Sequence, residues 1–102
     1  MICVIAAIEV AEGRREEFLN IFRKVVPTVR AEAGCLEYGP MVDTPTGIPG
    51  QQPVRPNTVT VVEKWQSPAA LEAHLATPHM RQFFAATEGL RTGLVLEVLE
   101  PA

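Results

Sequence analysis

Four segments of the chain have side chains that divide into two faces with a period of two: 2–10, 35–42, 58–66 and 94–99. This period predicts β-strands, because successive side chains of a strand point to opposite faces of a sheet. In the first segment both faces are apolar, with Ile2, Val4, Ala6, Ile8 and Val10 on one and Cys3, Ile5 and Ala7 on the other. Such a strand is typical of a central position in a sheet covered on both sides. Ala6 and Ala7 are small and leave space next to whatever covers them.

A helical period replaces the alternation after the first strand. The predicted helix runs from Arg14 to Val26, and its apolar stripe consists of Phe18, Ile21, Phe22, Val25, Val26 and Val29. Pro27 then interrupts the hydrogen-bond ladder. We therefore expect either a bent helix or a second short one that continues to about Glu32 and closes at Gly34.

Two more helices are predicted after the third strand. Ser67-Pro68 and Thr77-Pro78 are both start signals, because Ser and Thr cap helix N-termini and Pro fits the first helical position. The first of these helices is expected to end near Ala76. The second is expected to end near Glu88, with Gly89 in a left-handed cap.

The order of elements predicts one domain, 1–102, of the α+β class. Strand, helix, strand, strand, helices, strand is the ferredoxin-like βαββαβ arrangement, with an antiparallel four-stranded sheet and helices on one face. Residues 43–57 are rich in Pro and Gly and have no apolar period, so we expect a long loop there. The uncovered apolar face of the sheet predicts a homodimer in which a second copy buries it.

Composition excludes several classes of partner. The net charge of −3 comes without a basic patch, so nucleic acid is not an expected partner. No apolar run is long enough to cross a membrane.

The start of the chain has no basic region before its apolar stretch and is interpreted as a strand, not a signal peptide, so we expect a cytoplasmic protein. The two cysteines are too few for a disulfide framework and are expected to be reduced core residues.

The stretch 61–84 gathers most of the chemistry of the chain. It contains both histidines, His74 and His79, and the only tryptophan, Trp65. Glu63 lies two residues before Trp65, so both belong to one face of the third strand. We expect a pocket between this strand and the two helices that follow it.

Two motifs resemble the antibiotic-biosynthesis monooxygenase (ABM) family. They are Glu-Ala-Gly-Cys-Leu-Glu-Tyr (32–38) and Glu-Lys-Trp-Gln-Ser-Pro-Ala-Ala-Leu-Glu-Ala-His-Leu-Ala-Thr-Pro-His-Met-Arg-Gln-Phe (63–83). Within the family the chain is most similar to the quinol-monooxygenase-like proteins. The resemblance implies a dimeric α+β barrel with a pocket in each subunit. It also implies oxidation of a quinol or polyphenolic substrate by O₂ without metal or flavin.

The haem-degrading branch of the family does not fit this chain. That branch uses an Asn on the first strand and a Trp and a His on the later helices. The corresponding positions here hold Ala6 or Ala7, His74 and Phe84.

A cofactor-free oxygenase needs a base and an apolar cavity that excludes water. We predict His79 as the base, because it lies in the first turn of its helix, where the helix dipole favours a neutral imidazole. Glu63 is predicted to orient a histidine or accept a hydrogen bond, unless its partner is a structural arginine such as Arg81 or Arg91. The predicted substrate-contacting residues are Trp65, Tyr38, His74, Phe83 and Phe84. Each histidine also has a purely structural interpretation. For His74 this interpretation is favoured over a functional one, and for His79 the two have equal weight.

No cofactor is expected. His74 and His79 are five residues apart across a helix break, which is not the one-face spacing of a zinc helix, so we predict no metal site. No phosphate-binding motif is present in the sequence. Two hypotheses remain: a cofactor-independent monooxygenase acting on a small aromatic or hydrophobic substrate, and a non-catalytic dimeric module that binds a small hydrophobic ligand.

Overall fold

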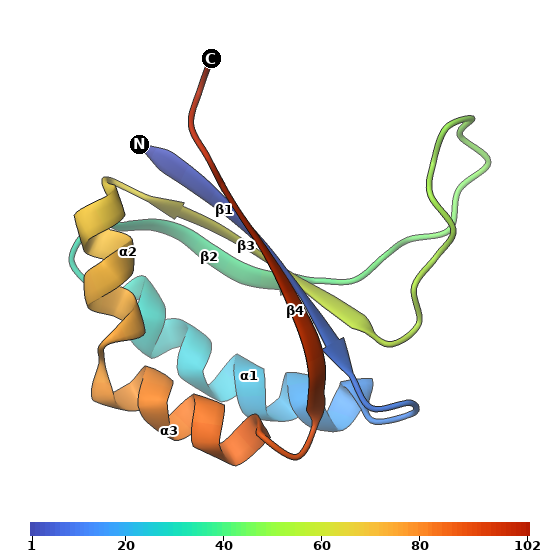
Figure 1. The fold of residues 1–102 in the computed structure, drawn as a ribbon, viewed down its shortest axis with the longest axis horizontal. Helices are drawn as coiled ribbons and strands as arrows, with labels where there is room; N and C mark the ends of the chain where they lie inside the picture. The colour runs from blue at the N-terminus through green and yellow to red at the C-terminus, as the bar shows by residue number, and fades with distance from the viewer.

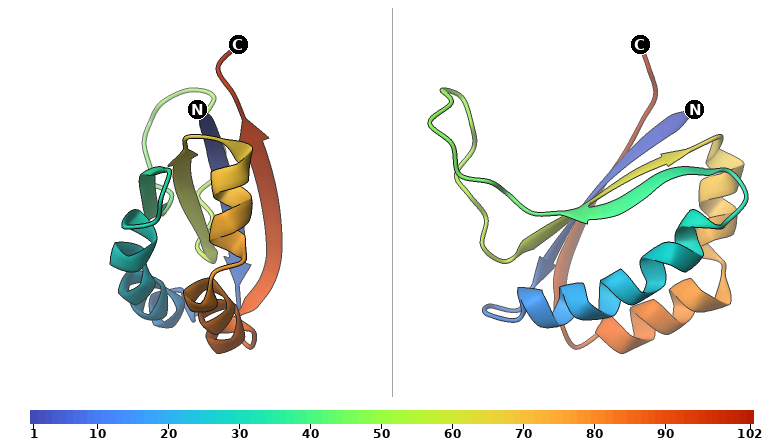
Figure 2. Two further views of the ribbon diagram at one scale, coloured as in Figure 1. Left: turned by 90° about the vertical axis from the view of Figure 1, so that its left-hand side faces the viewer. Right: turned by 180° about the vertical axis from the view of Figure 1, so that it is seen from behind.

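Four strands form one antiparallel sheet in the order β2-β3-β1-β4, and three helices lie on one of its faces (Figures 1 and 2). The computed structural model describes all 102 residues. The elements are β1 (Ile2–Val10), α1 (Arg15–Arg30), β2 (Cys35–Met41), β3 (Thr58–Trp65), α2 (Pro68–Leu75), α3 (Pro78–Thr87) and β4 (Arg91–Leu99). This order confirms the predicted ferredoxin-like arrangement.

Helix α1 is a single helix despite the proline inside it. Pro27 removes one backbone donor, but the turns on both sides keep their apolar contacts to the sheet. Phe22, Val26 and Val29 are all buried. Burial of this continuous stripe outweighs one lost hydrogen bond.

Two expectations about the C-terminal part are wrong. Gly89 does not adopt a left-handed conformation; the glycines with positive φ are Gly13, Gly34 and Gly50. Strand β4 begins at Arg91, three residues earlier than predicted. Its early part escaped the sequence pattern because Arg91, Thr92 and Gly93 are not apolar.

Gly34 controls how the end of α1 meets α2. Its φ is +83°, and a Cβ built on it would lie 2.7 Å from the Cβ of Ala70. Only glycine accommodates both the backbone angle and the close approach. The tight turn holds Glu32, two residues before Gly34, against His74 of α2.

Aromatic rings connect the helices to the sheet across the core. The ring of Phe22 stacks on Tyr38 at 5.7 Å between centroids, and Tyr38 meets Trp65 edge-on at 6.4 Å. The imidazole of His74 completes the group at 4.7 Å from the Trp65 ring. Rings packed this way hold one another in fixed orientations.

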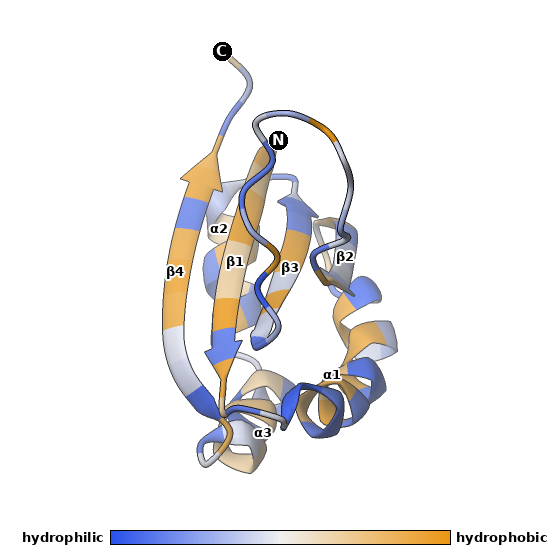
Figure 3. Ribbon diagram, turned by 90° about the vertical axis from the view of Figure 1, so that its right-hand side faces the viewer, coloured by the Kyte–Doolittle hydropathy of each residue, from blue (hydrophilic) through white to orange (hydrophobic).

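The opposite face of the sheet is apolar and uncovered in the single chain. Figure 3 shows that hydrophobic residues predominate along β1 and β4. Val95 and Leu99, opposite Ala7 and Cys3, are 65% and 46% exposed. The prediction that β1 is covered on both sides therefore does not hold within one chain.

The predicted long loop projects away from the sheet (Figure 1). It is fastened at its base by a bidentate pair between Arg55 and Asp43, at 2.8 and 2.9 Å. Hydrogen bonds from Arg55 hold the pKa of the Asp43 carboxyl down at about 2. None of the three helices has the length and apolar character needed to cross a membrane.

Candidate functional site

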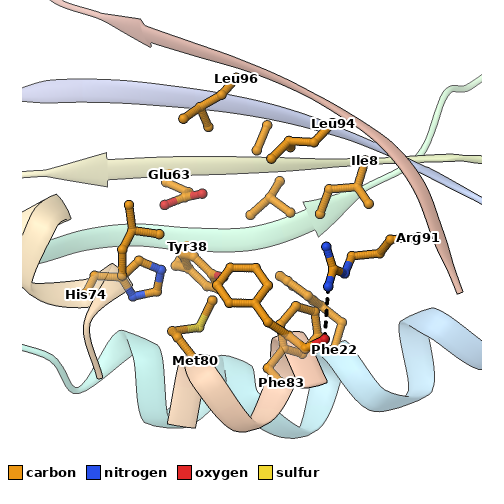
Figure 4. Close-up of a pocket in the computed structure, with 14 residues that line it drawn as sticks. Ile8, Phe22, Tyr38, Glu63, His74, Met80, Phe83, Arg91, Leu94 and Leu96 are labelled. Carbon is orange, nitrogen blue, oxygen red and sulfur yellow. Dashed lines mark hydrogen bonds between the residues drawn. The ribbon is translucent and has the colours of Figure 1, made fainter. Parts of the chain in front are cut away.

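An apolar cavity of about 190 Å³ lies between the sheet and helices α2 and α3 (Figure 4). Its walls come from 14 residues, 11 of them hydrophobic; the exceptions are Glu63, His74 and Arg91. A cavity of about 150 Å³ can hold a benzene ring, so there is room here for a small aromatic molecule. Ala6 lies in the wall, which agrees with the space predicted beside it.

Glu63 projects from β3 into this apolar surrounding and is 6% exposed. The Nε1–H of Trp65 donates a hydrogen bond to its Oε1 at 2.9 Å. Burial raises the pKa of Glu63 to about 7; the Trp65 bond opposes the shift, and the charge of Glu32 adds to it. The carboxyl is therefore poised between its protonated and ionised forms near neutral pH.

The expected arginine partner of Glu63 is not observed. Arg91 instead donates to Thr87 Oγ1 and to the Phe84 carbonyl, and its guanidinium lies over the Phe84 ring. No hydrogen bond or ion pair joins either Arg91 or Arg81 to Glu63.

His74, on α2, presents its imidazole to the same cavity, as Figure 4 shows. The residue is 1% exposed, and its Nδ1 lies 2.9 Å from Oε2 of Glu32. Burial lowers the pKa of His74, although the Glu32 hydrogen bond and charge act in the opposite direction. In the neutral ring an Nδ1–H that donates to Glu32 leaves the lone pair on Nε2.

Glu32 is the residue that sequence analysis missed. Its Oε2 contacts both His74 Nδ1, at 2.9 Å, and His79 Nε2, at 2.8 Å. The two histidines thus meet at one carboxylate, although their spacing of five residues across a helix break is not that of a zinc helix. Glu32 opens the first family-like motif, and that position was the only signal in the sequence that could have identified it.

Five of the seven predicted site residues line the cavity: Tyr38, Glu63, His74, Phe83 and Phe84. The other two, Trp65 and His79, do not. Trp65 is fully buried beside Glu63, whereas the side chain of His79 is 25% exposed and contacts Glu32. The role of His79 as a base stays a prediction.

Fold and cavity together define a small α+β domain with an apolar cavity that contains one carboxyl group and one imidazole. The family model for antibiotic biosynthesis monooxygenase matches residues 1–86. The chain belongs to this family.

Several known proteins are similar over nearly the whole chain. The Escherichia coli protein named "Probable quinol monooxygenase YgiN" is 41% identical, covering 99% of this chain and 98% of its own. The crystal structure of PA3566 from Pseudomonas aeruginosa has a TM-score of 0.82 at 30% identity, over 99% of this chain and 93% of that one. Rv0793 from Mycobacterium tuberculosis shares the fold, with a TM-score of 0.80 at 22% identity over 99% and 94%.

Proposed function

We propose that the protein is a cofactor-independent monooxygenase that oxidises a quinol or a related phenolic compound with O₂. The observation that carries this proposal is the pairing, in one apolar cavity, of a carboxylate-oriented imidazole and a carboxyl group with a raised pKa. Membership of a monooxygenase family and the printed name of the Escherichia coli relative support the substrate class.

The first step is removal of a phenolic proton by Nε2 of His74. Glu32 holds the ring in the tautomer that accepts this proton and stabilises the imidazolium that forms. The resulting anion is electron-rich and reduces O₂ itself. A quinol and O₂ give a hydroxylated quinone and one water, so the substrate supplies all the electrons and no external reductant enters.

Glu63 contributes the second polar contact of the cavity. Its Oε1 is occupied by Trp65, and no partner holds Oε2. When protonated, the carboxyl can donate a hydrogen bond to a substrate oxygen. The surrounding apolar wall excludes water and strengthens this contact.

The test is oxygen consumption by metal-free protein with a panel of benzoquinols, naphthoquinols and simple phenols. We expect turnover of at least one quinol, with one atom of isotope-labelled O₂ in the product. Binding of quinols without oxygen uptake would overturn the catalytic proposal. It would support the second candidate, a non-catalytic module for a small hydrophobic ligand, which the apolar cavity also favours.

We further propose that a second copy of the chain covers the apolar outer face of the sheet. Light scattering at micromolar concentration should give twice the chain mass of 11.1 kDa. Val95→Glu places a charge on this face, in the middle of β4, and should produce monomers. Ile48→Glu, at an equally exposed position (68% against 65%) on the loop, should leave the dimer intact. A monomeric parent protein would contradict the proposal; the cytoplasmic location stays a prediction.

A further inference from the structure

Three metal-ligating side chains meet behind the cavity wall. Oε2 of Glu32, Nδ1 of His74 and Nε2 of His79 all lie within 4.8 Å of one another. Of the three residues, only His74 lines the cavity. The cluster therefore lies on the far side of the His74 ring from the space proposed for the substrate.

We propose that Glu32, His74 and His79 form a binding site for a divalent transition metal of the zinc type. The bound metal converts Nε2 of His74, which faces the cavity, from a proton acceptor into a hydrogen-bond donor. The effect of the metal on proton abstraction by His74 rests on the proposed function, whereas the metal site itself rests on the geometry alone.

The donor set and its spacing suit this class of ion. Two imidazoles and one carboxylate are a known ligand set for Zn²⁺, with bonds of about 2.0–2.2 Å, so tetrahedral ligand atoms lie roughly 3.3 Å apart. The carboxylate oxygen is already 2.9 Å from one imidazole nitrogen and 2.8 Å from the other. Small side-chain movements open the space for the ion, and the partly exposed His79 side chain leaves a path for it and for a water ligand.

Charge favours the same occupant. The Glu32 side chain is only 12% exposed, and its ion-pairing partners are the two histidines, with no Lys or Arg within 4 Å. Buried carboxylates are normally paired with a cation or coordinate a metal. A divalent cation supplies the missing positive charge.

Metal at Nδ1 changes which nitrogen of His74 carries the proton. Without metal, Nδ1–H donates to Glu32 and Nε2 keeps its lone pair toward the cavity. When Nδ1 binds the ion, the neutral ring must carry its proton on Nε2. The cavity then faces a donor instead of an acceptor, so the metal inhibits the proposed proton abstraction. Because the ion lies behind the ring, the substrate does not reach it.

The test begins with calorimetric titration of metal-stripped protein with Zn²⁺, and with the visible spectrum of bound Co²⁺. We expect one ion per chain. Glu32→Gln and His79→Ala should each weaken binding at least about 100-fold, since even outer-shell partners of a metal are worth 10–100-fold. Glu72→Gln, an exposed carboxylate on the same helix as His74, is the matched control and should bind normally. Equal binding by the parent and Glu32→Gln would overturn the site.

NMR of isotope-labelled histidine tests the change of tautomer at His74 without any substrate. One equivalent of Zn²⁺ should move the His74 proton from Nδ1 to Nε2. An unchanged tautomer in the metal-bound protein would overturn the switch. Neither measurement depends on turnover, so failure of the proposed oxygenase activity is seen separately in the oxygen-uptake assay. Melting curves of both variants confirm folding. If Glu32→Gln is unstable, His79→Ala still tests the site, because the His79 side chain is partly exposed.

Discussion

His74→Asn is expected to lower quinol oxidation by about 10²–10⁴-fold, the usual contribution of a positioned general base. The asparagine amide can still donate to Glu32 in place of Nδ1–H, but nothing replaces Nε2 at the cavity. The substitution thus removes the proton acceptor while keeping the contact that joins α2 to the end of α1. Initial rates of oxygen uptake at saturating quinol measure the loss, and it should appear in kcat.

His79→Gln is the matched comparison, because its amide can still donate to Glu32 in place of Nε2–H. His79 does not line the cavity, so we expect a loss at least tenfold smaller than that of His74→Asn. A larger loss for His79→Gln would identify His79 as the base, as the sequence alone suggests. Thermal melts of both variants exclude unfolding as the cause.

The fold was predictable because its signals are local. The two-residue alternation placed Val59, Val61, Glu63 and Trp65 on one face of β3, and all four are buried on the helix side. The caps at Ser67 and Thr77 are present, each accepting from the backbone N–H three residues later. Periodicity and capping act within a few residues of the chain, so one sequence suffices to detect them.

The site was predictable only in part, because its key contact is not local. Glu32 lies 42 residues from His74 and 47 from His79, and no period or spacing links such positions. The sequence also does not reveal which residues of one strand face line the cavity: Glu63 and Trp65 share a face, yet only Glu63 reaches the cavity. Which of two neighbours lines a cavity depends on how the helices cover the sheet, and this is decided by packing across the whole domain.

The stability of the protein should fall as pH rises from about 4.5 to about 7, relative to the variant Glu63→Gln. Burial raises the pKa of Glu63 from its usual 4.5 to about 7 in the folded state. Between these values the folded state binds more protons than the unfolded state at this residue, so raising the pH favours unfolding. A shift of this size corresponds to about 3 kcal/mol of unfolding free energy, since one pKa unit is 1.36 kcal/mol.

Glu63→Gln keeps the shape of the side chain and cannot ionise, so the difference between the two proteins isolates this group. His74 titrates in both and cancels; its lowered pKa alone would weaken the fold as pH falls. Glu72→Gln, the same substitution at an exposed position, is the matched control. Denaturant unfolding at intervals across this pH range gives the measurement.

The variant Trp65→Phe provides a second, independent test of the raised pKa of Glu63. Its indole N–H stabilises the ionised carboxylate and lowers the pKa of Glu63. Without that donor the carboxyl should stay protonated to higher pH, so the fall in stability should start at the same pH but continue to a higher one. If the pH dependence of Glu63→Gln equals that of the parent, Glu63 ionises as an ordinary solvated carboxyl. It then has no protonated form at neutral pH with which to hold a substrate oxygen.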